Sequence, residues 1–308
     1  MFDFLFEKAL KASVMSTELF IKAKASKNTL LEAFKIAKDI EEKFSAYKNN
    51  SAIDEINKNA GIAPVACDDE VLALIKESLK IAKATDGKFD PTIGTLSQGL
   101  YGFGTKNPKI PSQKEISLAK ELVNFKEVEI LGNLVFLRKK GMKIDLGGIG
   151  KGYAAEKIIN FFIDKKASFA LASVGGEICC YGKEYKIGIK NPFEEGNIAT
   201  ITTTKNPTTI TTSGDYERYI NSKKTHHILD SKNGISNNFY SSITLIKDGF
   251  FGSELDAFAT AIFNTKPQEL EKISKEQEMT IIAITPNKEI LFLNKEKNFY
   301  KKIDFEQI

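Results

Sequence analysis

Short runs of β-branched and small residues dominate the second half of this 308-residue chain. Such runs, bounded by turn-forming residues, are typical of β-strands. They cover residues 169–174, 177–182, 185–190, 198–204, 208–213, 226–230, 279–285 and 289–294. Strands that follow one another with short connections pair antiparallel, whereas parallel strands need a crossover helix between them. The pattern therefore predicts mixed, largely antiparallel sheets and favours them over a doubly wound parallel sheet.

Helical patterns are inserted between these strands in blocks. After an alternating strand that begins at Thr17, we expect Asn28 to cap a helix, because apolar residues then recur every three or four positions. Further helices are predicted over 69–84, after the glycines at 147–152, and from Ser253. This arrangement indicates an α+β fold in a single two-lobed unit.

Two other features organise the first half of the chain. Gly132 and Asn133 separate two apolar runs, which predicts a β-hairpin over 128–139, followed by a strand that ends near Asp145. The stretch 87–113 is rich in glycine and proline, and a loop of that length in a folded domain is usually functional.

Composition excludes several classes of protein. The chain has 44 Lys and Arg against 40 Asp and Glu, a net charge of +4 without a basic, aromatic-rich run, so we expect no nucleic-acid partner. Three cysteines make no disulfide framework. Asp3, Glu7 and Lys8 interrupt what would be a signal peptide, and no run approaches the roughly 18 apolar residues of a membrane span. We therefore expect a cytoplasmic protein.

The segment KIDLGGIGKGYAAEKI carries the densest chemical signal. An acid ends the expected strand, glycines crowd the turn, and Lys151 stands at the start of a helix, where backbone amides favour a phosphate. Neither the Walker A pattern nor GxGxxG fits, since Asp145, Gly152 and Tyr153 occupy the wrong positions. The alternative interpretation is a tight turn beside a surface lysine.

A second signal lies in SELDAFATAIF. Asp256 and Thr260 stand four residues apart and share one helix face, and their oxygens suit Mg²⁺. The competing interpretation is local capping by Ser253 and Asp256. The histidines are adjacent, and strand alternation places His226 and His227 on opposite faces, where one could act as a general base.

Taken in order, these segments resemble the ApbE family, the FAD:protein FMN transferases. The resemblance covers about Met15 to the C-terminus, with 1–14 as an N-terminal extension and 15–308 as one T-fold-related domain. Eight ordered motifs carry it: VMSTEL, FSAYKNNSAIDEIN, FDPTIGTL, DLGGIGKGYA, ASVGGEI, TTSGDYERY, HHILDSKNG and LDAFATA.

The resemblance implies a set of site residues. Those lining the FAD site are Met15, Tyr47, Lys88, Phe89, Asp90, Asp145 and Lys151, with His227 close by. It also implies that Mg²⁺ is held by Asp256, Thr260 and the backbone carbonyl of Gly148. The two strongest signals then belong to one diphosphate site.

The implied reaction moves the FMN half of FAD onto a Ser or Thr hydroxyl of an acceptor flavoprotein and releases AMP. Either His227 or Asp145 would take the hydroxyl proton. Family acceptors include subunits of membrane NADH:quinone and other electron-transport complexes. The alternatives are an FAD pyrophosphatase using the same site and a non-catalytic FAD-binding protein.

This chain departs from the family pattern in two places. Ser16 replaces the usual glycine of the first motif, which a small residue should tolerate. This sequence does not show the family's usual export signal, so we expect either a true N-terminus upstream or a cytoplasmic member, whereas the resemblance alone implies the periplasmic face of the inner membrane.

Overall fold

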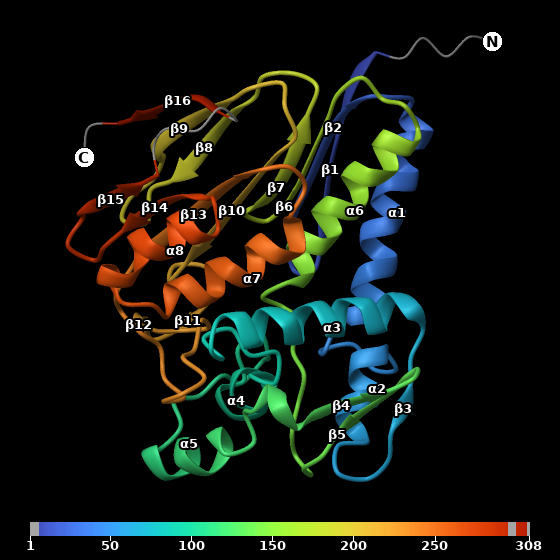
Figure 1. Ribbon diagram of the computed structural model, residues 1–308, viewed down its shortest axis with the longest axis vertical. Helices are drawn as coiled ribbons and strands as arrows, with labels where there is room; N and C mark the ends of the chain where they lie inside the picture. The colour runs from blue at the N-terminus through green and yellow to red at the C-terminus, as the bar shows by residue number, and fades with distance from the viewer. Residues whose placement is uncertain (1–5, 295–299, 307–308) are drawn as a thin grey trace.

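An eight-stranded sheet forms the centre of the computed structural model, which describes residues 6–294 and 300–306 (Figure 1). Its strand order is β1-β2-β6-β7-β10-β13-β14-β15, and every neighbouring pair is antiparallel. The strands are β1 (Glu7–Val14), β2 (Thr17–Lys24), β6 (Ala170–Val174), β7 (Glu177–Tyr181), β10 (Thr208–Gly214), β13 (Ser242–Asp248), β14 (Thr280–Ile284) and β15 (Ile290–Leu293). The predicted α+β fold with largely antiparallel sheets is confirmed.

Four helices pack on one face of this sheet (Figure 1). They are α1 (Lys27–Phe44), α6 (Gly150–Asp164), α7 (Gly252–Phe263) and α8 (Leu270–Glu276). Because α1 begins at Lys27, Asn28 lies inside its first turn, and the prediction that Asn28 caps the helix is wrong. The Ser26 side chain accepts the Thr29 N–H instead, from the position just before the first turn where a cap must stand.

A second part of the molecule lies below the sheet in Figure 1. It contains α2 (Ala52–Lys58), α3 (Asp69–Ala84), α4 (Gly94–Leu96), α5 (Gln113–Lys120), β3 (Val65–Ala66), β4 (Val128–Leu131) and β5 (Leu134–Leu137). The predicted helix over 69–84 and the hairpin at Gly132 are confirmed. The glycine-rich stretch 87–113 is packed rather than structureless, since Leu96, Tyr101 and Phe103 are buried in a small core of their own.

Two smaller sheets complete the fold. One has the order β16-β9-β8, with β8 (Lys186–Lys190), β9 (Asn197–Thr203) and β16 (Tyr300–Phe305). Its apolar side chains share a core with β10, β13 and β14 of the central sheet. The other pairs β11 (Tyr219–Ile220) with β12 (Ser222–His226). The expected strand over 226–230 is therefore wrong except for its first residue.

The strand expected to end near Asp145 is also wrong. Lys143 makes a single isolated bridge with Ile93, and no ladder extends from it within the described part of the chain. The Asn57 side chain satisfies the neighbouring backbone instead: its Oδ1 accepts the Ile144 N–H at 2.6 Å and its Nδ2 donates to the Ile144 carbonyl at 2.9 Å. One amide side chain thus replaces a strand partner.

The segment set apart as an N-terminal extension takes part in the sheet. β1 pairs with β2 along its whole length, through a turn in which Met15 and Ser16 both have positive φ, at 53° and 59°. Positive φ at both central residues is the type I′ geometry that favours glycine, so Ser16 adopts this conformation at an energetic cost that glycine would not have. Residues 1–5 lie outside the described residues. Among those described, no helix has the length and apolar character to cross a bilayer.

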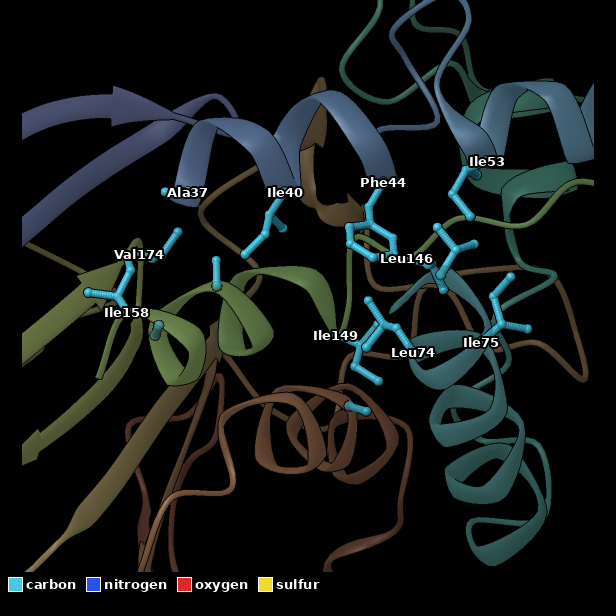
Figure 2. Close-up of a cluster of buried hydrophobic side chains, with 14 of the residues drawn as sticks. Ala37, Ile40, Phe44, Ile53, Leu74, Ile75, Leu146, Ile149, Ile158 and Val174 are labelled. Carbon is cyan, nitrogen blue, oxygen red and sulfur yellow. The ribbon is translucent and has the colours of Figure 1, made fainter. Parts of the chain in front are cut away.

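The largest core anchors the loop on which the site is built (Figure 2). Leu146 and Ile149 flank the Gly147–Gly148 pair and are both almost fully buried. Figure 2 shows them among side chains of α1, α2 and α3, including Phe44, Ile53 and Leu74. The loop backbone is therefore held from both sides, while its glycines remain free of bulk.

Candidate active site

The start of α6 has no side-chain cap from its own N-cap residue. Its N-cap residue, Ile149, contributes no side-chain hydrogen bond. The N–H of Gly152 is instead taken by Oδ2 of Asp256, at 3.0 Å, from the neighbouring helix α7. Asp256 therefore caps α6 across space, and the interpretation that it caps its own helix is wrong because its oxygens point at α6.

A pair of glycines brings α7 this close. A Cβ atom on Gly152 would stand 1.9 Å from the carbonyl oxygen of Gly252 and 2.8 Å from the Asp256 Cβ. A Cβ on Gly252 would stand 2.1 Å from the Gly152 carbonyl oxygen. Only glycine at both positions allows this crossing, and the crossing delivers Asp256 to the N-terminus of α6.

Lys151 lies between two buried carboxylates. Its Nζ is 3.2 Å from Asp256 Oδ1 and 3.1 Å from Glu177 Oε1. The two acids are only 1% and 3% exposed. Burial alone would lower the pKa of Lys151, but the two carboxylates outweigh it and raise that pKa. Lys151 is thus a fixed cation within the site, and the interpretation as a solvated surface lysine is wrong.

Gly148, Thr260 and Phe89 lie together beside this cluster. A Cβ on Gly148 would stand 3.0 Å from Thr260 Oγ1 and 3.4 Å from the Phe89 ring. Asp256 and Thr260 share one face of α7, one turn apart. The residues present offer a carboxylate, a hydroxyl and a nearby backbone carbonyl, which is a hard-oxygen set that suits Mg²⁺ with open positions for phosphate. Among the described residues, no group of three or more acidic, His or Cys side chains offers a different metal site.

Asp145 organises the loop that leads into α6. Its Oδ1 accepts the Gly147 N–H at 2.8 Å and its Oδ2 accepts the Ser97 hydroxyl at 3.1 Å. Its own N–H donates to the Pro91 carbonyl at 2.8 Å. Both carboxylate oxygens therefore already accept hydrogen bonds within the protein.

His227 lies close to two cations. It follows the last residue of β12, and its Nδ1 is 3.2 Å from the Arg218 carbonyl oxygen. Burial, assisted by the positive charges of Arg218 and Lys151, lowers the pKa of His227 to about 3. His226 is fully buried against Phe263, with ring centroids 5.2 Å apart. The two histidines thus have different surroundings, and only His227 remains available to a substrate.

Tyr47 lies near Asp145 and Arg218. Its hydroxyl donates to the Phe103 carbonyl at 3.1 Å, and its ring lies beside Gly104. The side chain of Arg218 also reaches Gly104. Burial raises the pKa of the Tyr47 hydroxyl, and the Asp145 carboxylate raises it further. Tyr47 and His227 thus both neighbour Arg218.

The remaining predicted residues lie around this group. Met15 forms the β1–β2 turn, and its N–H donates to Glu41 Oε1 at 3.0 Å. Lys88 pairs with Glu269 at 2.9 Å. Asp90 is 6% exposed, and its carboxylate accepts from the Thr92 N–H and hydroxyl and from the Phe125 N–H. Asp90 therefore braces the loop that carries Phe89.

Comparison with known proteins identifies the family to which this chain belongs. A family model described as "ApbE family" matches residues 14–284. This chain belongs to the ApbE family. Among curated members, an FAD:protein FMN transferase of Klebsiella pneumoniae is 28% identical over 302 residues, which cover 95% of this chain and 94% of that protein. One from Treponema pallidum is 28% identical over 257 residues and covers 76% and 70%.

Solved ApbE structures share the fold. The ApbE protein of Thermotoga maritima superposes with a TM-score of 0.87 at 28% identity, covering 96% of this chain and all of that one. The flavin transferase ApbE of Vibrio cholerae gives a TM-score of 0.82 at 20% identity, covering 94% and 97%. That second likeness concerns the fold alone.

Sequence reasoning missed two residues, Glu177 and Arg218, that the fold brings next to the predicted site residues. Glu177 lies in the ASVGGEI motif, and Arg218 lies in TTSGDYERY, so both were in quoted motifs without an assigned role. An acid directly after two glycines and one of only two arginines were the available signals. Neither signal identifies Lys151 or His227 as a neighbour, because those contacts arise only on folding.

Proposed function

We propose that this chain is an FAD:protein FMN transferase, which moves the FMN half of FAD onto an acceptor hydroxyl and releases AMP. The observation that carries the proposal is the placement of Lys151 and Asp256 at the start of α6, beside Gly148 and Thr260. A cation and hard oxygens gathered at the start of a helix suit a diphosphate and its metal. Membership of the ApbE family supports the same reaction.

Asp256, Thr260 and the carbonyl of Gly148 would hold Mg²⁺ in this protein. The bound ion would neutralise charge on the diphosphate oxygens and so assist phosphoryl transfer. The protein's own part is to keep these donors in place. Asp256 is held by the glycine crossing, and Gly148 is held by the buried side chains of Leu146 and Ile149 on either side.

His227 is the base that the geometry favours for the acceptor hydroxyl. If Nδ1–H donates to the Arg218 carbonyl, the lone pair lies on Nε2, and the lowered pKa keeps that nitrogen unprotonated at neutral pH. Asp145 is the weaker candidate, because both of its oxygens already accept hydrogen bonds. In the reaction, the hydroxyl oxygen bonds to the FMN phosphorus, the bond between the two phosphates breaks, and AMP leaves with that electron pair.

The flavin half of FAD would lie toward Tyr47, Met15 and Phe89. Tyr47 offers an aromatic ring near Arg218, and Phe89 adjoins Gly148. Lys88 and Asp90 flank Phe89 in the chain, and their observed contacts brace this loop. The acceptor is a flavoprotein with a Ser or Thr target.

Incubation of the protein with FAD, Mg²⁺ and a Ser- or Thr-containing acceptor peptide tests the proposal. The expected result is AMP in solution together with an FMN-sized mass increase on the peptide. AMP without any acceptor would instead identify an FAD pyrophosphatase. FAD binding without AMP in either case would identify a binding protein and overturn the proposal.

A further inference from the structure

Every N–H donor of the Lys151 ammonium group has an acceptor within the protein. Nζ is 3.1 Å from Glu177 Oε1, 3.2 Å from Asp256 Oδ1 and 3.2 Å from the Gly147 carbonyl oxygen. A lysine ammonium has three donors and no acceptor. In this FAD-free arrangement, Lys151 therefore has no donor left for a diphosphate.

Asp256 is the partner that can be exchanged. Its carboxylate accepts from Lys151 and from the Gly152 N–H, and the same oxygens are those that would bind the metal. A cation arriving at Asp256 therefore competes directly with the Lys151 ammonium. Once the Asp256 carboxylate binds that cation, one N–H of Lys151 becomes free for another acceptor.

Glu177 is held independently of Asp256. It stands at the start of β7, its Oε2 accepts the Thr211 hydroxyl from β10, and it is 3% exposed. The turn before it, at Gly175, lies against the Lys151 side chain, because a Cβ there would stand 3.7 Å from Lys151 Cδ. Glu177 is thus built into the central sheet and keeps its place whatever Asp256 binds.

We propose that Glu177 is a positioning residue that retains Lys151 when Asp256 changes partner from Lys151 to the metal. With a metal bound at Asp256, Lys151 would have one N–H free for the diphosphate while Glu177 keeps the Lys151 side chain in place. The identities of the metal and the diphosphate rest on the proposed function. Without Glu177, Asp256 is the sole carboxylate partner of Lys151 among the described residues. The ion pair between Lys151 and Asp256 would then be tighter, and a metal would have to displace it.

Titration of the FAD-free protein with Mg²⁺ by calorimetry tests this role. Glu177→Asp keeps the carboxyl group but shortens the reach by one methylene, so it should weaken Mg²⁺ binding about tenfold, the effect of one charged hydrogen bond. Thr211→Val keeps the Glu177 charge and removes the hydroxyl that fixes it. We expect a loss in the same direction, and this variant serves if Glu177→Asp folds poorly.

Glu156→Gln is the matched control. Glu156 is another partly buried acid, held at 3.4 Å by the Ser253 N–H, and Lys151 pairs with Glu177 and Asp256 rather than with it in the described part of the chain. The variant should leave Mg²⁺ affinity within about twofold of the parent. Glu177→Gln removes the charge but keeps an oxygen of similar reach, so its Mg²⁺ affinity separates the effect of the Glu177 charge from its effect on the position of Lys151.

Two outcomes would overturn the inference. Parent-like Mg²⁺ affinity in both Glu177→Asp and Thr211→Val would leave Glu177 as a packing residue. A loss of Mg²⁺ affinity in Glu177→Gln far larger than the losses in Glu177→Asp and Thr211→Val would show that the charge of Glu177, not its position, matters. Both readouts are independent of AMP release, so a failed transfer assay in the parent would refute the proposed function without deciding this point.

Discussion

Gly152 of α6 and Gly252 of α7 touch backbone to backbone, and this contact sets the distance between Asp256 and the N-terminus of α6. The two helices cross where neither has a side chain. Because the approach is closer than any Cβ would permit, the position of Asp256 depends on two residues that carry no chemistry themselves.

Gly152→Ala should therefore disrupt both stability and the site. The added methyl group would meet the Gly252 carbonyl at 1.9 Å, which requires the helices to move apart. We expect a loss of about 3 kcal/mol in the free energy of unfolding, the upper end of overpacking effects, measured by urea denaturation. Gly150→Ala is the control, since nothing lies within 4 Å of a Cβ there. Equal stability of the two variants would contradict the crossing argument.

Asp256→Asn should abolish most Mg²⁺-dependent AMP release while the protein stays folded. The Asn oxygen can still accept the Gly152 N–H, but it has lost the charge that a divalent cation requires. We expect a fall in rate of at least about tenfold, measured as AMP formed. Glu254→Gln on the same helix, where Glu254 pairs with Lys247, should leave the rate unchanged. Full activity in Asp256→Asn would remove Asp256 from the metal site.

His227→Gln should slow transfer without weakening FAD binding. Loss of a general base typically lowers the rate by about 100-fold or more, whereas flavin fluorescence quenching should report an FAD affinity near that of the parent. Because the pKa of His227 is lowered to about 3, the imidazole is neutral throughout the range from about pH 5 to 8. The parent kcat/KM should thus not fall toward about pH 5 through this group. A fall centred near the ordinary histidine pKa of about 6.5, absent in His227→Gln, would contradict the lowered pKa, whereas a parent-like transfer rate in His227→Gln would contradict the base assignment.

Asp215→Asn should stabilise the protein above about pH 6. Asp215 is 6% exposed, its Oδ1 has no hydrogen-bond partner within the described residues, and burial raises its pKa to about 6. A carboxyl whose pKa is raised on folding contributes its full stability below the unfolded pKa of about 4 and loses it as pH rises through about 6.

The Asn side chain is neutral at every pH and avoids that loss. We expect the variant to gain roughly 1–3 kcal/mol over the parent at about pH 8 and the gain to disappear by about pH 4. Thermal or urea unfolding at the two pH values measures it. A difference in the free energy of unfolding between variant and parent that is the same at both pH values would show that ionisation of Asp215 does not destabilise the folded protein.

Local features of the chain were readable in advance. The apolar periodicity of 69–84 predicted α3 with both of its ends, and Gly132 with Asn133 predicted the β4–β5 hairpin. The ordered motifs identified the ApbE family, which the family model confirms over 14–284. These succeeded because helix periodicity, turn chemistry and motif order are properties of neighbouring residues. The roles assigned to individual site residues remain predictions.

Other features depended on which side chain hydrogen-bonds the backbone in the folded protein. Asn28 was predicted as the helix cap, but the Ser26 side chain accepts the Thr29 N–H in the structure. A strand was predicted to end near Asp145, but the Asn57 side chain, 87 residues away in the sequence, hydrogen-bonds the Ile144 backbone. In each case a side chain made the hydrogen bond that another group was expected to make, and the sequence pattern does not show which of the two forms.

The sequence by itself determined the fold class, most of the elements and the family. Only the tertiary structure decided what the site residues do to one another. Asp256 and Lys151 are 105 residues apart in the sequence but form an ion pair, and Glu177 of the central sheet forms a second ion pair with Lys151. That cluster exists because two glycines let α6 and α7 cross in contact. It also exists because a buried charge is stable only beside a group of opposite charge, so Lys151, Asp256 and Glu177 stabilise one another.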